Sequence, residues 1–372
     1  MTALFNILQR IFRREGIRVG IFRVLGLALT LNFIFGTAFY FAERDVQEGL
    51  EYTDALWWAM VSMTTVGYGD YYAQTALGRF IISYPCMLIG IGIIGYLVGI
   101  LAESMLERIS NRRRGLMQIE EKGHILICNC PSTERVLQIV DELKAHTEYA
   151  ERVFVLITAA FDELPALLAK DGLLFVKGSP TQEDILMQAN VAHCGGVFIL
   201  ATNPGNADSD AQTFAVGTIV EMIAREQNRP IQVVAEMVSK KNIKMMQRAG
   251  TDGIVAPEGI SDCMLVQEFL YPGTYEVFQQ LMSNAIGSQF YIFDTQLEGV
   301  HLSDIQVAVL RHPANMQLIG IVRNNTPHLN PPETMKLQAD DRVIMLAESK
   351  EDFKTMERDL LQAQTAQASA TN

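Results

Sequence analysis

The five cysteines of the chain show no C-x-x-C spacing and no pattern of a disulfide framework. This scarcity argues against the common zinc-binding motifs and against a small, disulfide-stabilised fold. We therefore expect the cysteines to be reduced, buried and in a cytosolic environment. They are Cys86, Cys128, Cys130, Cys194 and Cys263.

The chain also lacks an excess of positive charge. It has 30 Lys and Arg against 42 Asp and Glu, a formal net charge of −12, which excludes binding to a nucleic acid backbone as its main activity. The charge is unevenly placed, because basic residues crowd positions 10–23 and 112–114 while most acids follow residue 120. This asymmetry predicts a membrane part followed by a soluble, acidic part.

Two stretches contain no charge at all, Val24–Ala42 and Phe80–Ala102, and each is close to the roughly 20 apolar residues that a membrane-spanning helix needs. A secretory signal peptide is the alternative for the first stretch, but its aromatic end, Phe39–Phe41, is typical of the interfacial belt of a retained helix. The flanking basic residues predict a multi-pass protein of the plasma membrane with both termini cytoplasmic. Residues 1–23 would then form an N-terminal cytoplasmic amphipathic segment.

The loop between the two spans contains a short amphipathic run, predicted as a helix over residues 53–64 with Asp54 or Thr53 as its N-cap. The stretch TTVGYGD, Thr64 to Asp70, follows it. Non-helical backbone at membrane depth is tolerated only where protein buries it or where it lines a watery cavity, so this pattern indicates a re-entrant loop. A glycine-rich turn between two membrane helices is the alternative.

The stretch TTVGYGD, preceded by ALWW, resembles the potassium-channel signature at every position. The resemblance implies that backbone carbonyls of residues 65–69 replace the water around a permeant K⁺, with glycine adopting the required dihedrals at low cost. It also implies that Trp58 packs behind the filter and that Asp70 supports it. With two spans per chain, a closed pore needs a homotetramer. The predicted filter residues are Thr65, Val66, Gly67, Tyr68 and Gly69.

One position departs from the pattern. Many channels of this kind have a glutamate behind the filter that pairs with the aspartate after the last glycine, and this chain has Val61 there. Asp70 therefore lacks that carboxylate partner. No helix carries arginine at every third position, which argues against a voltage sensor.

Four glycines interrupt the second span, Gly90, Gly92, Gly95 and Gly99. They indicate either close helix packing or a point where an inner helix bends as a pore opens. We expect the hinge at Gly92 or Gly95. Leu97, Ile100 and Leu101 are candidates for a hydrophobic constriction near the cytoplasmic end.

Beyond a linker at residues 103–121, apolar strands alternate with amphipathic helices through residue 257, which predicts a parallel, Rossmann-type sheet. Together with the pore, this part resembles the RCK domain, also called TrkA-N, in the stretches VKGSPTQEDILMQANV and RAGTDGIVAPE. The resemblance implies a gating ring of eight such domains, a crossover helix-turn-helix at 258–284 and a small α/β lobe at 285–361. We further predict an exposed turn at Asn324–Pro332 and a disordered tail at 362–372.

The first strand-to-helix turn, Asn129–Glu134, contains no glycine, although a dinucleotide site usually has a G-x-G-x-x-G motif there. The second strand ends at Thr158–Ala159 without an acid for the ribose. Asn129, Ser132 and Thr133 remain candidates to bind an adenine nucleotide, NAD or another anion at the helix N-terminus. The alternative is that Ser132 and Thr133 only cap that helix.

Calcium-activated members of the resembled family carry three carboxylates at the ends of the fourth and fifth strands. The matching positions here are Ala201, Glu236 and Val238, so only Glu236 is left as a candidate ligand for a divalent cation such as Ca²⁺. Activation through that site is therefore not expected.

The sequence thus predicts a multi-domain chain. An α-helical pore domain of residues 24–102, with spans 24–42 and 80–102, precedes a cytosolic α/β Rossmann-like domain of residues 122–257 and the C-terminal lobe. The predicted function is a potassium-selective channel, embedded in membrane lipid and gated by a small molecule or ion that binds the ring. It is not expected to be an enzyme. The alternatives are a membrane-anchored nucleotide-binding oxidoreductase and a non-conducting regulatory subunit of a potassium transporter.

Overall fold

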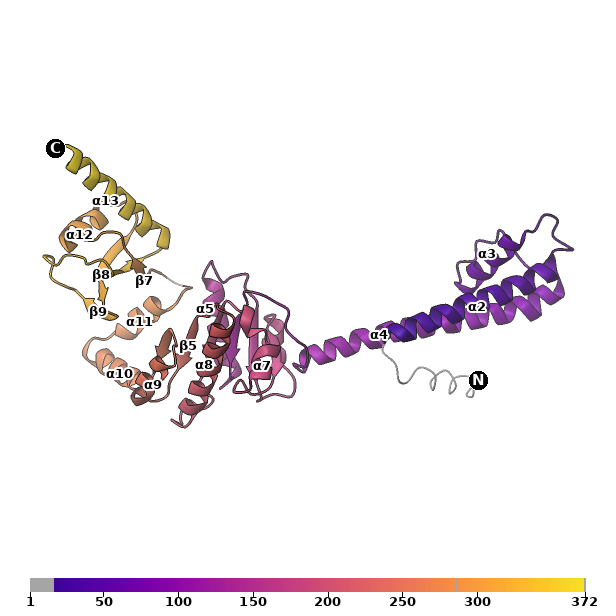
Figure 1. Cartoon of the computed structure of the whole chain (residues 1–372), viewed down its shortest axis with the longest axis horizontal. Coiled ribbons are helices and arrows are strands. Elements are labelled where there is room, and N and C mark those ends of the chain that lie inside the picture. Colours follow the sequence, from indigo (N-terminus) through magenta and orange to yellow (C-terminus); the bar gives the residue numbers. More distant parts are fainter. Residues whose placement is uncertain (1–16, 286, 371–372) are drawn as a thin grey trace. The chain divides into compact units, whose positions relative to one another are not determined.

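The computed structural model describes residues 17–285 and 287–370 and divides into two units, residues 1–112 and 113–372. The first unit is helical (Figure 1). It contains α2 (Ile17–Glu43), α3 (Tyr52–Met63), a π-helix (Leu77–Ser83) and α4 (Tyr84–Arg113). Two helical stretches, Ile21–Glu43 and Leu77–Arg113, are long and apolar enough to cross a membrane. Most of the predicted N-terminal segment, residues 1–16, lies outside the described residues.

The short helix α3 begins with a reciprocal arrangement of two acids. Glu51 is the N-cap residue, and its backbone N–H donates to Oδ2 of Asp54 at 3.0 Å. Asp54 therefore belongs to the first turn, so our prediction of Asp54 or Thr53 as the N-cap was wrong by two to three positions. A carboxylate in the first turn also interacts favourably with the positive end of the helix dipole.

The α4 helix continues the π-helix that precedes it and extends to Arg113, so the residues predicted to begin a linker at position 103 are still helical. Pro85 has no N–H to donate to the preceding turn, and the wider π-helix lies directly before it. The Ser83 Oγ donates to the Gly78 carbonyl at 2.8 Å. The inner helix thus begins with an irregular turn and then runs as one α-helix.

The second unit begins with a six-stranded parallel sheet in the order β3-β2-β1-β4-β5-β6. The strand order reverses between β1 and β4, as in doubly wound folds. The strands are β1 (Ile125–Cys128), β2 (Phe154–Thr158), β3 (Leu174–Lys177), β4 (Gly196–Ile199), β5 (Val233–Glu236) and β6 (Gly253–Val255), and the helices that follow them are α5 (Thr133–Ala145), α6 (Ala166–Lys170), α7 (Glu183–Gln188), α8 (Ser209–Glu226) and α9 (Ile243–Arg248).

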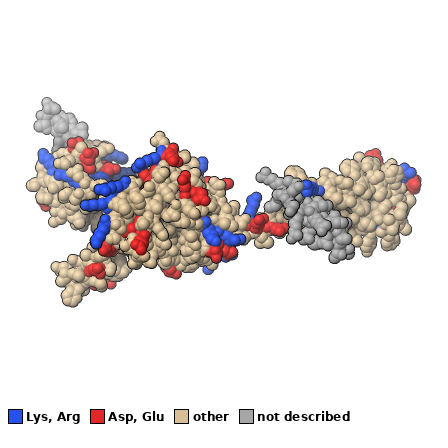
Figure 2. Space-filling view, turned by 60° about the horizontal axis from the view of Figure 1, so that its bottom comes forward, with Lys and Arg blue, Asp and Glu red and all other residues tan. Residues whose placement is uncertain are grey.

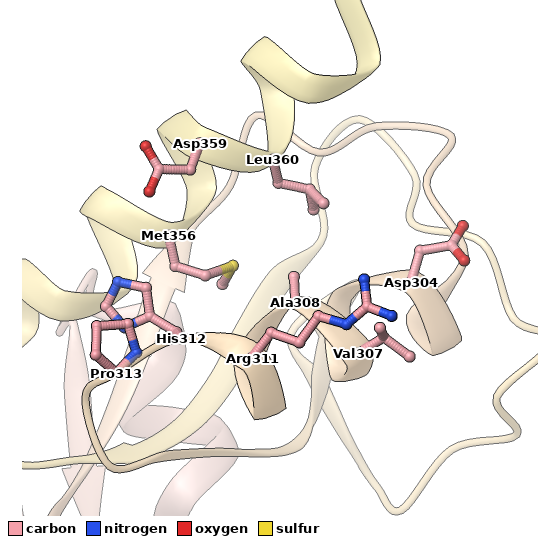
Figure 3. Close-up of a pocket in the computed structure, with 9 residues that line it drawn as sticks. All are labelled: Asp304, Val307, Ala308, Arg311, His312, Pro313, Met356, Asp359 and Leu360. Carbon is pink, nitrogen blue, oxygen red and sulfur yellow. The ribbon is translucent and has the colours of Figure 1, made fainter. Parts of the chain in front are cut away.

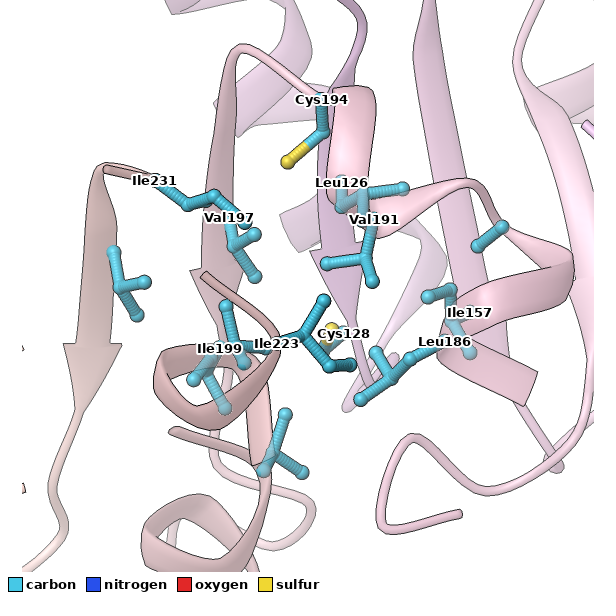
Figure 4. Close-up of a cluster of buried hydrophobic side chains, with 14 of the residues drawn as sticks. Leu126, Cys128, Ile157, Leu186, Val191, Cys194, Val197, Ile199, Ile223 and Ile231 are labelled. Carbon is cyan, nitrogen blue, oxygen red and sulfur yellow. The ribbon is translucent and has the colours of Figure 1, made fainter. Parts of the chain in front are cut away.

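Both faces of this sheet are buried, which explains why its strands are almost continuously apolar. On one face, Ile125 and Ile127 pack with residues of α5 and α6. On the other, Leu126 and Cys128 pack with residues of α7 and α8, and Figure 4 shows Cys128 and Leu186 among these side chains. The alternating side chains of β1 therefore belong to two separate cores, one on each face of the sheet. The predicted Rossmann-like fold is confirmed.

The cysteines are free, but they are not all buried. Cys86, Cys128 and Cys194 are buried, Cys130 is half-buried and Cys263 is exposed, so the prediction of five buried thiols was wrong for the last two. Burial raises the pKa of Cys194 to about 11, which keeps this thiol protonated and unreactive near neutral pH.

After the sheet come two short helices, α10 (Ile260–Leu270) and α11 (Thr274–Met282), within the predicted crossover segment. The last lobe, the C-lobe, is an antiparallel sheet in the order β7-β10-β8-β9 with α12 (Leu302–Arg311) and α13 (Lys350–Ala370). Its core includes Phe293 stacked on Phe353 with ring centroids 4.6 Å apart. The strands are β7 (Gln289–Asp294), β8 (Met316–Arg323), β9 (Thr326–Leu329) and β10 (Arg342–Ala347).

Two predictions for the C-lobe were wrong in part. The segment predicted as an exposed turn, Asn324–Pro332, is exposed and begins with a turn at Asn324 and Asn325, but it also contains the edge strand β9, which pairs antiparallel with β8. Edge strands tolerate proline, which explains why Pro327 did not prevent pairing. The tail predicted to be disordered from residue 362 continues α13 to Ala370, in a run of Ala and Gln that favours helix, while residues 371–372 lie outside the described residues.

Candidate functional site: a filter-like loop and a sheet crevice

The segment Thr65–Gly69 has an alternating backbone. Thr65, Gly67 and Gly69 have positive φ angles of 62°, 61° and 77°, while Val66 and Tyr68 between them do not. Glycine adopts this conformation at little cost, but a β-branched threonine rarely does. Such strain persists only where the surroundings impose it, and it is typical of functional sites.

The end of the pore helix α3 holds this backbone in place. The backbone N–H groups of Val66 and Gly67 both donate to the Val61 carbonyl, at 3.1 and 3.4 Å. The N–H of Thr65 donates to the Ser62 carbonyl at 3.2 Å. The amides of Thr65, Val66 and Gly67 are therefore directed back to the helix.

The sequence predicts that Trp58 packs behind the filter. Within the single chain, however, it is Trp57 that contacts Tyr68 and Asp70. Trp57 Nε1 donates to Asp70 Oδ2 at 2.8 Å, and its ring stacks on Tyr68 with centroids 5.9 Å apart. Trp58 is buried on another side of the helix, where it stacks on Phe39 at 3.8 Å. Asp70 therefore has a partner within its own chain although Val61 replaces the usual glutamate.

A fully buried carboxylate, Glu43, connects the end of α2 to the segment after the filter. It accepts from the backbone N–H of Gln74 at 2.9 Å, from the N–H of Thr75 at 3.1 Å and from the Thr75 hydroxyl at 2.7 Å. A Cβ atom added at Gly78 would lie against this carboxylate, so a larger residue there would require the Glu43 side chain to move. Sequence reasoning missed Glu43, although an acid that ends an apolar span could have indicated it.

The glycines of α4 separate into two groups. A Cβ at Gly90 would lie 2.5 Å from the Met63 carbonyl at the end of α3, so Gly90 serves close packing. Gly92 and Gly95 have no heavy atom within 4 Å of such a Cβ. Leu97 follows Gly90 and Ile93 at helical spacing on the packed face, which disfavours it as a residue lining a pore. The hinge at Gly92 or Gly95 stays a prediction.

The sheet crevice at the carboxyl ends of β1 and β4 is the second candidate site. Asn129, which follows β1, has a φ of 71° and takes the left-handed conformation that glycine usually provides in a nucleotide-binding turn. Its Nδ2 donates to the Leu200 carbonyl at 2.9 Å. The turn therefore contains a left-handed residue although it contains no glycine, and this could not be seen from the missing motif.

The other predicted ligand residues in this turn bind partners within the chain. Ser132 Oγ accepts from the Arg135 N–H at 3.2 Å, so it caps α5, as our alternative proposed. The Thr133 hydroxyl donates to Glu134 at 3.0 Å. The pKa of Glu134 is lowered, chiefly by a hydrogen bond from its own backbone amide.

Glu236, at the end of β5, also has internal partners. Its Oε1 lies 2.6 Å from Arg135 NH2, and its Oε2 accepts from the Ala201 N–H at 3.0 Å. Within residues 17–285 and 287–370, no group of three or more His, Cys, Asp or Glu side chains could hold a metal ion. The arrangement thus favours an ion pair and not the predicted role of Glu236 as a metal ligand.

A pocket of about 340 Å³ lies between α12 and α13 in the C-lobe and was not predicted (Figure 3). Met356 and Leu360 of α13 point toward Ala308 and Arg311 of α12, so aliphatic surface and one guanidinium share the opening. The acidic side chains of Asp304 and Asp359 lie at its ends. The lining residues are Asp304, Val307, Ala308, Arg311, His312, Pro313, Met356, Asp359 and Leu360.

Charged side chains are concentrated on the second unit, whereas the described surface of the first unit visible in Figure 2 is nearly free of them. Many of its exposed side chains are large and apolar, for example Phe22, Leu29 and Phe80, which are 74%, 60% and 66% exposed. A soluble monomer rarely exposes so much apolar surface. These helices therefore need lipid or further protein chains around them.

Two family models match the chain. The model described as "Ion channel" matches residues 27–107, and the model described as "TrkA-N domain" matches residues 134–257. The chain is 25% identical to the calcium-gated potassium channel TvoK of Thermoplasma volcanium over 85% of this chain and 88% of that protein. It is 24% identical to potassium channel protein 1 of Methanocaldococcus jannaschii over 92% of this chain and 97% of that protein.

Among solved structures, the chain is similar to the GsuK channel bound to NAD, with a TM-score of 0.45 and 16% identity. The match covers 93% of this chain and 60% of that one, so the chain spans less than two thirds of the length of that solved channel.

Proposed function

Since the chain belongs to the potassium channels that carry a TrkA-N domain, we propose that it forms a homotetrameric, potassium-selective pore opened or closed by a ligand of that domain. The observation that carries the proposal is the alternating backbone of Thr65, Gly67 and Gly69, anchored through the Val61 carbonyl. Four copies of this segment around one axis would stack rings of carbonyl oxygens that replace the hydration shell of K⁺.

Membrane insertion places α2 and α4 across the bilayer with both termini in the cytoplasm, following the basic residues at the outer ends of the spans. The TrkA-N domains then lie on the cytoplasmic side of the membrane. The relatives are named as channels and not as enzymes, which supports a non-enzymatic role for this domain.

Assembly into a ring of eight TrkA-N domains is supported by exposed apolar residues on the crossover helices. Leu265, Phe269 and Met282 are 70%, 85% and 78% exposed in the single chain. Surfaces of this kind on a soluble domain mark contacts with other protein chains.

The gating ligand that fits the crevice best is a small phosphate-bearing molecule such as an adenine nucleotide. The left-handed Asn129 preserves the turn that such ligands use, and α5 begins beside it. The relative TvoK is named as calcium-gated, but here only Glu236 of the three expected carboxylates is present and it is already paired. A ten-fold difference in affinity between two ring states supplies about 1.4 kcal/mol per site, so several sites can drive one pore.

A flux assay with purified protein in liposomes tests the channel function. We expect uptake of K⁺ or Rb⁺ that is blocked by barium, with much less uptake of Na⁺. Absence of selective flux from correctly assembled tetramers would contradict the proposal and favour a non-conducting subunit.

A further inference from the structure

A partly buried ion pair occupies the region where the strand order of the parallel sheet reverses. The Glu236 side chain is 7% exposed, and the Arg135 side chain, on the first turn of α5, is 35% exposed. One carboxylate oxygen lies 2.6 Å from the guanidinium, and the other accepts from the Ala201 N–H at 3.0 Å. Charge-assisted contacts of this kind are short and strong.

The partners of Glu236 are groups that bind phosphates. A guanidinium and a backbone N–H beyond the end of a strand are the donors that anionic ligands use in folds of this class. They come from two elements, α5 and the segment after β4, next to the left-handed Asn129. In this chain these donors already hold a carboxylate of the protein itself.

We infer that the Arg135–Glu236 pair is an autoinhibitory contact, in which Glu236 competes with a phosphate-bearing ligand for Arg135 and the Ala201 amide. The inference rests on the proposed function, because it concerns the ligand of the TrkA-N domain. The ligand binds by displacing Glu236, and the displaced carboxylate is costly because it lies buried without its partner. Arg135, being partly exposed, is free to turn toward the ligand.

The test is titration calorimetry on the full-length tetramer in detergent with ADP, NAD⁺ and inorganic phosphate as separate probes. Glu236→Gln keeps an oxygen that accepts from the Ala201 N–H but removes the competing charge. We expect at least one probe to bind this variant ten-fold or more tightly than the unmodified chain, or to bind measurably where the unmodified chain shows no binding.

A matched control removes the same charge elsewhere in the domain. Glu221, which is half-buried, pairs with the exposed Arg225 on α8, and Glu221→Gln should leave binding unchanged. The double variant Glu236→Gln with Arg135→Gln should lose the gained affinity, since the phosphate then has no guanidinium.

The inference is overturned if Glu236→Gln gains no affinity for any of the three probes, or if the gain persists without Arg135. If Glu236→Gln does not assemble, Glu236→Asp is the second variant, because its side chain is shorter by one methylene and its carboxylate lies farther from Arg135. This variant should bind a probe more tightly than the unmodified chain, by a smaller factor than expected for Glu236→Gln. If its affinity does not increase, the inference is overturned as well. Barium-blocked K⁺ flux, measured in parallel, separates this failure from a failure of the channel function itself.

Discussion

Trp57 and Asp70 are joined by a 2.8 Å hydrogen bond from the indole Nε1 to the carboxylate Oδ2, next to the predicted filter. The same indole stacks on Tyr68, so one side chain of the pore helix contacts the filter by its ring and its polar edge. The second oxygen of Asp70 accepts from the Tyr71 N–H at 3.1 Å. Tyr68 and Asp70 are thus held by α3 and by the residue that follows Asp70.

A double-mutant cycle measures this bond. Trp57→Phe keeps an aromatic ring against Tyr68 and removes the donor, while Asp70→Asn weakens the acceptor. Each single variant should lower tetramer stability by about 1 kcal/mol, and the double variant should cost clearly less than the sum. The midpoint of K⁺-protected thermal dissociation of the tetramer is the measurement, with Trp58→Phe as the control that shows no coupling to Asp70. Strict additivity for Trp57 and Asp70 would contradict a direct bond.

Gly67→Ala tests the backbone of the filter. Gly67 has a φ of 61°, which alanine adopts only with strain, so the carbonyl direction should change while the helices remain. We expect loss of K⁺ flux of at least ten-fold with tetramers still present by size-exclusion chromatography. Gly26→Ala, in α2 with open space around the added methyl group, should conduct normally. Normal selectivity in Gly67→Ala would refute the role of the carbonyl rings.

Gly90→Ala tests the contact between the inner helix and the pore helix. The added methyl group would lie 2.5 Å from the Met63 carbonyl, so α4 and α3 must separate. Overpacking of this kind costs about 1–3 kcal/mol, which should lower the thermal dissociation midpoint of the tetramer. Gly92→Ala adds the same methyl group where no atom lies within 4 Å and should leave the midpoint near that of the unmodified chain. Equal midpoints for both variants would argue against close packing at Gly90.

Glu43→Gln tests the buried carboxylate at the end of α2. A carboxylate accepts from all four surrounding donors, the N–H groups of Gln74 and Thr75, the Thr75 hydroxyl and the Gln47 side-chain amide, whereas an amide presents N–H groups to some of them and leaves donors facing one another. We expect a loss of about 1–3 kcal/mol in tetramer stability. Glu48→Gln changes the same charge at an exposed site nearby and should have no measurable effect. A Glu43 variant as stable as this control would exclude the proposed connection.

How much the sequence could predict depended on how local each feature is. The filter segment is specified by five consecutive residues, Thr65–Gly69, and the alternating strands and helices are specified by runs of apolar residues. The choice between Trp57 and Trp58 is not local. The two side chains point in directions about 100° apart on the helix, and the packing of Phe39 against Trp58 decides which one faces the filter.

Contacts between residues far apart in the chain could not be predicted from the sequence for the same reason. Glu43 and Thr75 are 32 positions apart, and Arg135 and Glu236 are 101 apart, so no spacing rule relates them. In the turn after β1, a rule based on glycine did not predict the left-handed residue, because Asn129 adopts this conformation without being glycine. The motif describes residue types, whereas the conformation of the turn is a property of the backbone.

The C-lobe offers a prediction that depends on pH. Asp341 is buried and accepts from Arg323 Nε and NH2 and from the Gln338 N–H, and the Arg323 guanidinium lowers the pKa of this carboxyl group. A carboxyl group whose pKa is lower in the folded state than in the unfolded state stabilises the fold above its unfolded pKa, about 4, and that stabilisation disappears as pH falls through the folded pKa.

The unmodified C-lobe should therefore lose stability as pH is lowered from 5 toward 3, whereas Asp341→Asn should be less stable at pH 7 and should lose less on acidification. Hydrogen exchange of the β8 and β10 amides, read by mass spectrometry at each pH, reports this lobe specifically. Asp340→Asn, at the exposed neighbouring position, should follow the unmodified chain at every pH. If Asp341→Asn and the unmodified chain show parallel curves, the Arg323–Asp341 pair does not set the acid sensitivity of the lobe, and the other buried contacts of β10 must do so.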